Sequence, residues 1–320
     1  MIETRGLTKR YGPTLAVDDL SFTIRPGRVT GFLGPNGAGK STTMRMILGL
    51  DRPTSGHALI GGRPYEDLRQ PLREVGALLD AKWVHPNRSA RAHLRWLARS
   101  NRLPAARVDE VLDQVGLTAV AGHRAGTFSL GMSQRLGIAG ALLGDPGVLL
   151  FDEPVNGLDP EGIVWIRRFM RDLAAEGRSV LVSSHLLPEM ALTATDLVVI
   201  GRGRLIAQSS TAEFVEGAVT STVRVRSPQL PALAEVLMRQ GIDVRAEPGD
   251  DGSLVVAGTD TVRVGELAAG AGVVLHELAL QRGSLEEAFM HITGHDVEYS
   301  AGGSAGVRND DSAVLAAAGR

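Results

Sequence analysis

The segment Gly34–Ser41 (GPNGAGKS) has the residue types and the spacing of a loop that binds phosphate groups. It follows a β-type run, Val29–Leu33, and leads into a segment with Met44, Ile47 and Leu48 at helical spacing, which is the context such a loop requires. Glycines let the backbone curl until successive N–H groups converge on phosphate oxygens, and the start of the next helix adds its positive dipole end. The sequence therefore predicts a binding site for a nucleoside triphosphate.

Two side chains of this loop carry specific chemistry. Lys40 supplies a positive charge for the phosphates, and the hydroxyl of Ser41 is a ligand for Mg²⁺. We expect Lys40 to take part in catalysis as well as in binding.

A pair of acids ends the short apolar run Gly147–Phe151. Such a run predicts a buried parallel strand that delivers Asp152 and Glu153 at its carboxyl end, where open α/β sheets bind their ligands. We expect Asp152 to hold Mg²⁺ opposite Ser41, and Glu153 to polarise the water that attacks the γ-phosphate. An acidic pair buried there without a cation would be costly, which disfavours a purely structural role.

Three further motifs identify a family. They are Thr127–Arg135 (TFSLGMSQR), Asn156–Asp159 (NGLD) and Ser183–His185 (SSH). With Tyr11, the phosphate loop and the acidic strand, they occur in the order of the ATP-binding cassette of ABC transporters, which the chain resembles over about residues 1–215. Within that family it is similar to the ATP-binding subunits of bacterial exporters of the drug- and bacitracin-resistance types, which are encoded separately from their membrane partner.

The resemblance implies a role for each motif. Ser129, Gly131 and Met132 are implied to meet the γ-phosphate of ATP held by the opposite cassette, and Asp159 to lie in a loop at the dimer interface. His185 is implied to contact the γ-phosphate and hold the attacking water. The residues implied to bind ATP are Tyr11, through stacking on adenine, and Gly34, Pro35, Asn36, Gly37, Ala38, Gly39, Lys40, Ser41 and Thr42.

Three of these residues have alternative roles that do not involve ATP. Tyr11 can be a partly exposed aromatic, Ser129 a helix N-cap, and His185 a structural histidine.

The chain departs from the family pattern at two places. Leu130 and Phe128 stand where the signature has Gly and Leu, although Gly131 is retained. Asp80 follows the run Val75–Leu79 where most cassettes have a Gln that touches the metal-bound water. Asp80 can approach Mg²⁺, but its charge is repelled by the triphosphate when the metal is absent.

Composition fits an α/β enzyme of two units. The chain has 320 residues, 43% hydrophobic and 22% charged, with a formal net charge of −2 and no cysteine. It has no apolar run of the ~18 residues that a membrane span requires, and Met1–Arg5 does not begin a signal peptide. We therefore expect a peripheral protein on the cytoplasmic side of the membrane, with ATP and Mg²⁺ as cofactors, a separate membrane-spanning permease as partner, and no nucleic acid.

The expected fold is an α/β P-loop cassette with a small α+β domain. The cassette is predicted over residues 1–215, with a helical subdomain at about 82–145 that includes Val108, Val111, Leu112 and Val115 at helical spacing.

The second domain is predicted over 216–294. It has strands at Thr222–Arg226, Ile242–Val244, Leu254–Val256 and Val273–Leu275, a helix over 231–240, and a last helix opened by the capping box Ser284–Glu287. Residues 295–320, rich in Gly, Ala, Ser and Asp, are predicted to be a disordered tail.

The predicted function is ATP hydrolysis between two head-to-tail cassettes, a homodimer or a heterodimer with a paralogue, coupled to transport, with export favoured. The alternative is a non-transport or regulatory cassette. Translation cassettes carry two phosphate loops in one chain, DNA-repair cassettes need long coiled coils, and GTPases need an Asn-Lys-x-Asp motif; this sequence has none of these.

A last feature lies outside the motifs. Between Ala81 and Val108 the sequence has no acid but seven basic residues: Lys82, Arg88, Arg91, Arg95, Arg99, Arg102 and Arg107. The steps of 3, 4, 4 and 3 from Arg88 to Arg102 place five arginines on one helical face. This face is either solvated and neutralised by acids elsewhere, or a docking surface for acidic groups of the membrane partner or for anionic lipids.

Overall fold

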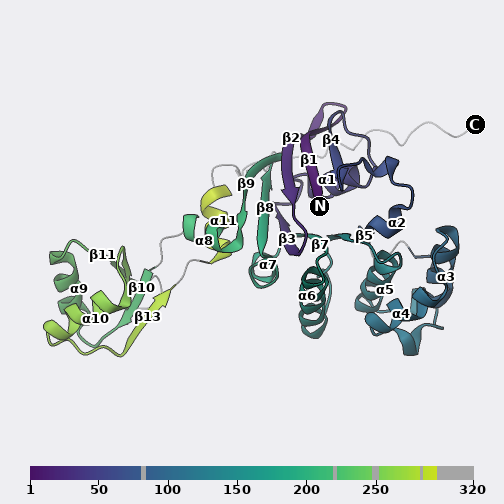
Figure 1. Cartoon of the computed structure of the whole chain (residues 1–320). Helices are drawn as coiled ribbons and strands as arrows, with labels where there is room; N and C mark the ends of the chain where they lie inside the picture. The colour runs from purple at the N-terminus through teal and green to yellow at the C-terminus, as the bar shows by residue number, and fades with distance from the viewer. Residues whose placement is uncertain (81–83, 219–221, 247–251, 282–283, 294–320) are drawn as a thin grey trace, which may run out of the picture.

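The structure is a computed structural model, and it describes residues 1–80, 84–218, 222–246, 252–281 and 284–293 (Figure 1). Lys82 and the predicted tail at 295–320 lie outside the described residues.

A six-stranded sheet of order β5-β6-β7-β3-β8-β9 lies at the centre of the molecule (Figure 1). Its strands are β3 (Arg28–Leu33), β5 (Val75–Leu78), β6 (Val148–Asp152), β7 (Ser179–Ser184), β8 (Asp196–Gly201) and β9 (Arg204–Ser210). All neighbours pair in parallel except β9, which is antiparallel to β8. The carboxyl ends of β3, β5, β6 and β7 therefore meet at one edge, where the sequence places the phosphate loop, Asp80, the acids and His185.

Both faces of this sheet are buried. On β3, Phe32 packs into one core cluster and Leu33 into the other, and on β6 Leu150 and Phe151 divide in the same way. Burial on both faces explains why these strands are continuous apolar runs rather than alternating ones.

One face is covered by a three-stranded antiparallel sheet of order β2-β1-β4 and by helix α1 (Figure 1). These elements, with the short helices that follow them, are β1 (Ile2–Tyr11), β2 (Thr14–Ile24), α1 (Lys40–Ile47), β4 (Ser55–Ile60), the 3₁₀ turn η1 (Tyr65–Asp67) and α2 (Pro71–Glu74). The other face is covered by α5 (Leu130–Leu142), α6 (Pro160–Ala175) and α7 (Leu187–Thr193). The α/β fold class predicted from the sequence is confirmed.

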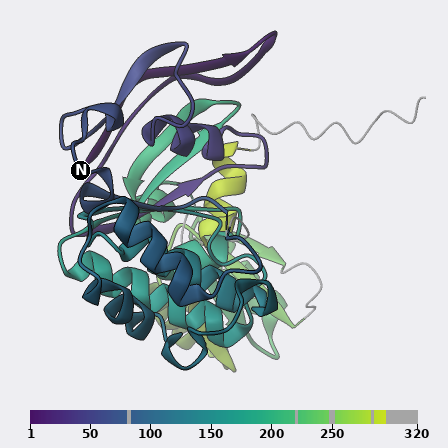
Figure 2. The same ribbon diagram turned by 90° about the vertical axis from the view of Figure 1, so that its right-hand side faces the viewer.

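The other helices of residues 84–145 pack against α5 (Figure 2). They are α3 (Ala90–Ser100) and α4 (Ala106–Gln114), followed by the 3₁₀ turns η2 (Thr118–Val120) and η3 (Ala125–Thr127). The hydroxyl of Ser89 caps α3 by accepting a hydrogen bond from the N–H of Ala92 at 3.2 Å. Val108, Val111 and Leu112 of α4 are buried, as their spacing predicts.

The C-terminal part holds a third sheet, of order β11-β12-β10-β13, antiparallel throughout. Its elements are β10 (Thr222–Arg226), α9 (Leu230–Arg239), β11 (Asp243–Ala246), β12 (Ser253–Ala257), α10 (Thr261–Gly270) and β13 (Glu277–Gln281). This βαββαβ arrangement is ferredoxin-like, with its own core around Val225, Leu237 and Val264. Helix α10 was not anticipated from the sequence.

The strand predicted at Val273–Leu275 is wrong, because the last strand begins at Glu277. Val273 and Leu275 are apolar because they pack onto the core of this unit from a connecting segment. Pairing with β10 starts only where Glu277 meets Arg226.

The chain returns to the first unit after β13. Helix α11 (Leu285–Thr293) lies beside α8 (Thr211–Ala218) and α7 (Figure 1). Ser284 and Glu287 form the predicted capping box, in which each backbone N–H donates to the side chain of the other residue, at 2.8 and 3.1 Å. Leu285 and Phe289 join Phe214 in the core that also contains the main sheet.

The packing of α11 corrects one part of the predicted division of the chain. The sequence reading grouped this helix with the second domain, over 216–294, but its apolar side chains are buried against α7 and α8. Local periodicity shows that a helix is amphipathic and does not show which surface covers it.

Among the described residues, none of the helices has the length and apolar character needed to cross a bilayer.

Candidate functional site

The phosphate loop Gly34–Ser41 joins β3 to α1, as predicted. Lys40 is only 7% exposed, and its ammonium donates to the carbonyl oxygens of Gly34 at 2.6 Å and Pro35 at 3.3 Å. Burial lowers the pKa of Lys40, and the nearby Glu153 and Asp152 carboxylates oppose that shift. The lysine is therefore held inside the loop, within electrostatic reach of both acids.

Gly39 shows why the loop needs glycine. It caps α1 with φ of 101°, and a Cβ atom there would stand 2.6 Å from the carbonyl oxygen of Ala16. Any other residue would be strained and would displace the backbone that brings the loop N–H groups together.

Asp152 and Glu153 lie at the carboxyl end of β6, and one buried hydroxyl touches both residues. Ser183 of β7 donates to the Oδ1 atom of Asp152 and accepts from the N–H of Glu153 at 2.9 Å. The contact depends on the parallel register in which Asp152 is paired with Ser183.

Glu153 is also bound to His185. The Nδ1 atom of His185 lies 2.8 Å from the Oε2 atom of Glu153. Glu153 has a φ of 48°, in the left-handed region that side chains other than glycine rarely adopt. Backbone strain of this kind costs about 1–3 kcal/mol and is found most often at functional sites. The two residues expected to handle the attacking water are therefore in direct contact.

The donor set at this edge fits Mg²⁺. The residues expected to bind it, Asp152 and the hydroxyl of Ser41, offer only oxygen atoms, which this ion prefers, and it commonly takes the rest from water and phosphates. In the described part of the chain no cluster of three or more His, Asp or Glu side chains forms a self-sufficient metal cage. A site completed by phosphate oxygens agrees with both observations.

Tyr11 ends β1 and is 46% exposed. Its hydroxyl donates to Asp51 at 2.8 Å, and the ammonium of Lys9 lies 4.8 Å from its ring centroid. Desolvation, followed by the bond to Asp51, raises the pKa of Tyr11. The ring is thus fixed close to α1 and accessible to solvent, which suits a stacking role.

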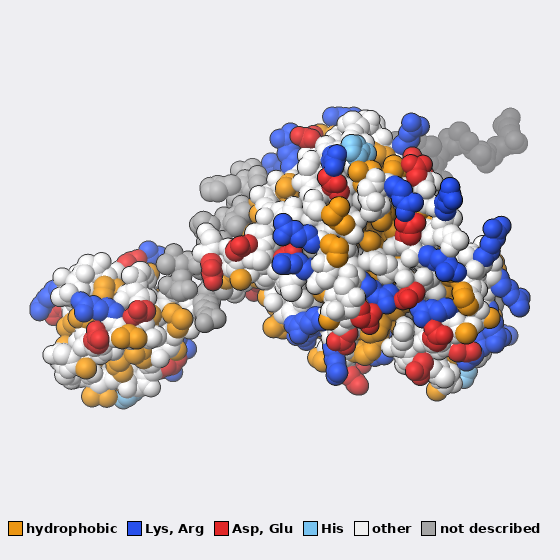
Figure 3. Space-filling view, viewed as in Figure 1, with side chains coloured by type: hydrophobic (Ala, Val, Ile, Leu, Met, Phe, Trp, Pro, Cys, Tyr) orange, Lys and Arg blue, Asp and Glu red, His pale blue; other side chains and the backbone are white. Residues whose placement is uncertain are grey.

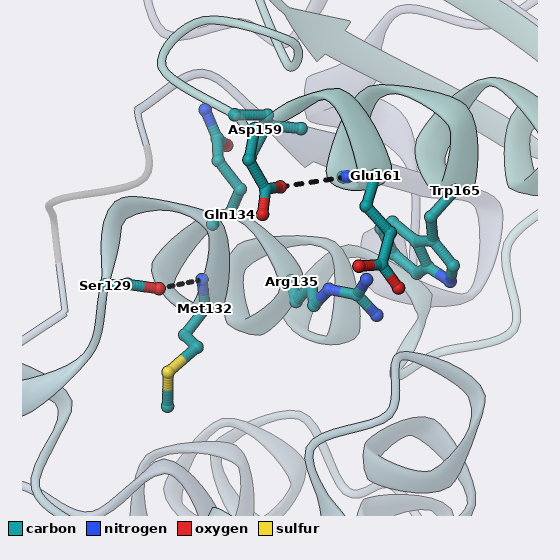
Figure 4. Close-up of a pocket in the computed structure, with 10 residues that line it drawn as sticks. Ser129, Met132, Gln134, Arg135, Asp159, Glu161 and Trp165 are labelled. Atoms are coloured by element: carbon teal, nitrogen blue, oxygen red, sulfur yellow. Dashed lines mark hydrogen bonds between the residues drawn. The ribbon is translucent and has the colours of Figure 1, made fainter.

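A second group of predicted residues meets elsewhere. Ser129, Gly131, Met132 and Asp159 line one pocket of about 240 Å³, together with Gln134, Arg135, Leu158, Glu161, Gly162 and Trp165 (Figure 4). Ser129 caps α5 by accepting from the N–H of Met132 at 3.2 Å, and Asp159 caps α6 by accepting from the N–H of Gly162 at 2.9 Å. None of the residues of the phosphate loop lines this pocket.

Two contacts brace the walls of this pocket. The guanidinium of Arg135 lies 3.9 Å from the ring centroid of Trp165, and its Nη1 atom donates to the carbonyl of Val115 at 2.9 Å. A Cβ atom on Gly157, whose φ is 71°, would meet the Leu130 side chain at 2.1 Å. The leucine that replaces the usual glycine therefore packs against the loop that leads to Asp159.

Asp80 lies two residues beyond β5, exposed, at the same sheet edge as Asp152. It forms an interaction within the protein. The sequence predicts a role for Asp80 near Mg²⁺ at this edge.

The structure thus places the predicted site residues in two separate groups. One lies at the sheet edge with the phosphate loop, and the other lies in the pocket between α5 and α6. Sequence reasoning missed Ser183 as the residue that joins the two acids. Its only signal was its place in the Ser183–His185 motif, because the bonds depend on strand pairing that the sequence does not specify.

Comparisons with known proteins identify relatives of this chain. A family model described as "ABC transporter" matches residues 17–156, and a "Domain of unknown function (DUF8746)" matches residues 221–286.

The chain is similar to two bacterial proteins. It is 36% identical over 307 residues to the uncharacterized ABC transporter ATP-binding protein YhcH of Bacillus subtilis, covering 93% of this chain and 97% of that protein. It is 42% identical over 209 residues to the bacitracin transport ATP-binding protein BcrA of Bacillus licheniformis, covering 64% and 68%. Among solved structures it is similar to cbiO1 of Clostridium perfringens, part of the complex cbiONQ, with a TM-score of 0.60, 26% identity and coverage of 75% and 95%.

Proposed function

Because the chain belongs to the ATP-binding proteins of ABC transporters, we propose that two copies form two composite sites that hydrolyse ATP and drive a separate membrane subunit. The observation that carries this proposal is the separation of the site residues into two groups. One chain presents a phosphate loop with Asp152, Glu153 and His185, and elsewhere a pocket lined by Ser129, Gly131 and Asp159. A head-to-tail pair would complete both sites.

In this proposal each residue of the first group has a defined task. Lys40 exchanges its hydrogen bonds to the loop carbonyls for bonds to phosphate oxygens, which relieves the cost of a buried ammonium. Glu153 accepts the proton of the attacking water, and His185 orients the Glu153 carboxylate through its Nδ1 contact. Asp152 and Ser41 hold Mg²⁺, which neutralises phosphate charge when it is bound.

The second group acts on the ATP of the other copy. The N-terminus of α5 carries free N–H groups and a positive dipole end, which suits a γ-phosphate, and Ser129 adds its hydroxyl there. ATP would therefore join the interface, and its hydrolysis would loosen it.

We propose export as the transport direction and the cytoplasmic side of the membrane as the location. The support for export is the likeness to BcrA, a bacitracin transport protein by name. A regulatory cassette that only binds ATP would have no use for the Glu153–His185 pair, so this alternative is not favoured.

Steady-state ATPase measurements test the enzymatic part. Replacing the base in Glu153→Gln is expected to keep ATP affinity and lower turnover by ~10²–10⁴-fold, about 3–5 kcal/mol of barrier. The matched control Glu176→Gln removes an exposed carboxylate that pairs with Arg178, and it should keep normal turnover. Lys40→Ala should lose nucleotide binding. Normal turnover in Glu153→Gln would refute the assigned role.

A further inference from the structure

Five arginines on one side of the molecule have no ion pair with any described acid: Arg69, Arg73, Arg95, Arg99 and Arg102. The acids around them that form ion pairs are bound to other arginines. Asp109 of α4 pairs with Arg91, and Glu74 of α2 pairs with Arg63 at 2.6 Å. Of the arginine face predicted from the sequence, Arg91 is therefore neutralised by a described acid, and Arg95, Arg99 and Arg102 are not.

These arginines line two neighbouring pockets. A pocket of about 350 Å³ is lined by Arg95 and Arg99, with Arg91, Trp96, Ser89, Ala92 and Gly122. A pocket of about 380 Å³ is lined by Arg69, Arg73 and Arg102, with Gln70, Pro71, Leu72, Ser100, Asn101 and Leu103. Neither pocket has an acidic residue in its lining, and α3 contributes residues to both. We call these five arginines and Trp96 the arginine surface.

Trp96 lies beside Arg95 and Arg99 in the lining of the first pocket. It is 51% exposed, and the guanidinium of Arg88 lies 5.0 Å from its ring centroid. Lys and Arg side chains gather at the right-hand edge of the molecule in Figure 3, where Figure 1 places α3. An exposed indole among unpaired guanidinium groups is the pattern that favours a lipid–water interface, because the ring tolerates both environments.

We propose that the arginine surface binds the phosphate headgroups of anionic lipids. Guanidinium groups bind phosphate in a two-pronged geometry. Two arginines without an ion pair, Arg95 and Arg99, line the first pocket, and three, Arg69, Arg73 and Arg102, line the second. In this proposal the exposed ring of Trp96, in the lining of the first pocket, enters the headgroup layer beside them. The proposal rests on the proposed function only in that the cassette works beside a membrane.

A lipid surface accounts for the pattern better than an acidic protein segment does. The charges are spread over two pockets rather than lining one groove: Arg95 and Arg99 come from α3, Arg102 from the segment after it, and Arg69 and Arg73 from α2 and the segment before it. Each basic residue held near an anionic membrane raises partitioning roughly fivefold at moderate salt.

The test is flotation of the full chain with vesicles that contain no permease. We expect binding to phosphatidylcholine vesicles with 30% phosphatidylglycerol at low salt, and loss of binding to pure phosphatidylcholine or at high salt. The double variant Arg95→Glu/Arg99→Glu should bind at least tenfold more weakly and keep its ATPase, which reports that it is folded. The matched control Arg168→Glu/Arg171→Glu makes the same charge change on exposed positions of α6 and should bind as the unmodified chain does.

Other outcomes overturn the proposal. Equal weakening by both double variants would mean that only net charge matters. Absence of vesicle binding, together with loss of permease assembly in Arg95→Glu/Arg99→Glu, would assign the surface to an acidic protein segment. Release of the chain from the vesicles by millimolar inorganic phosphate would indicate that the surface is a site for the free ion. None of these results bears on ATP hydrolysis, so failure here is separable from failure of the proposed function.

Discussion

A single buried hydroxyl, that of Ser183, links the two acids of the candidate site. It donates to Asp152 and accepts from the N–H of Glu153, so it fixes both the proposed metal ligand and the strained backbone of the proposed base. The neighbouring Ser184 is equally buried, but its hydroxyl accepts from the N–H of Leu186 at 2.9 Å and touches neither acid. Substituting Ser183 and Ser184 in turn therefore distinguishes the loss of a hydroxyl that positions the acids from the loss of any buried hydroxyl.

We expect Ser183→Ala to lower kcat about tenfold and to raise the Mg²⁺ concentration needed for half-maximal activity. Hydrogen bonds to charged groups contribute about 1.5–3 kcal/mol, which is of this size. ATPase activity as a function of Mg²⁺ concentration measures the effect. Ser183→Thr, which keeps the hydroxyl, should restore the Mg²⁺ dependence, and Ser184→Ala should leave it unchanged. The same Mg²⁺ dependence in both alanine variants would show that Ser183 does not position the acids.

At the scale of elements, α3 carries a buried titratable group on the face opposite its arginines. His93 is 3% exposed, and burial, with a smaller contribution from Arg88, lowers its pKa from 6.5 to about 4. Since the folded state binds fewer protons than the unfolded state between these values, stability is complete above pH 6.5 and is lost as the pH falls toward about 4.

The loss attributable to His93 is expected to reach about 1–3 kcal/mol near pH 4.5. The free energy of unfolding, measured in urea from pH 7 to pH 4.5, should therefore fall less steeply for His93→Gln than for the unmodified chain. His57→Gln changes an exposed histidine of β4 and serves as the control. Parallel curves for the chain and His93→Gln would contradict the account.

Helix α11 provides a second element-scale test, because its packing differs from the sequence prediction. Phe289→Ala removes a buried ring from the contact with α8 and is expected to cost about 3 kcal/mol. Amide hydrogen exchange should then quicken in α8 and α11 together, while the sheet of β10–β13 stays protected. Met290→Ala, at a neighbouring position that is 66% exposed, should change neither element. Loss of protection in β10–β13 instead of α8 would return α11 to the second unit.

Features that depend on local residues could be predicted from the sequence, and features that depend on tertiary packing could not. The phosphate loop could be located because Gly39 and its neighbours demand one backbone path, and the capping box at Ser284 because it is a local pattern. The start of β13 could not be located, because Val273 and Leu275 are apolar through their packing onto the core and not through strand formation. The bonds of Ser183 and the ion pair of Arg91 with Asp109 join distant segments, and their existence depends on register and helix packing that local residues do not encode.

At the scale of the whole molecule, the central claim is that one chain carries two half-sites and needs a second copy to use them. The variant Glu153→Gln should bind ATP without consuming it, so ATP should accumulate at the interface and hold two copies together. Adding Gly131→Glu places a negative charge in the first turn of α5, where the helix tolerates it, but where it would oppose the triphosphate of the other copy.

Analytical ultracentrifugation of these two variants, with and without ATP and Mg²⁺, tests this claim most directly. The account predicts that Glu153→Gln is a monomer without nucleotide and a dimer with it, and that Glu153→Gln/Gly131→Glu binds ATP but stays monomeric. A Glu153→Gln chain that remains monomeric at saturating ATP, or a double variant that still dimerises, would contradict it.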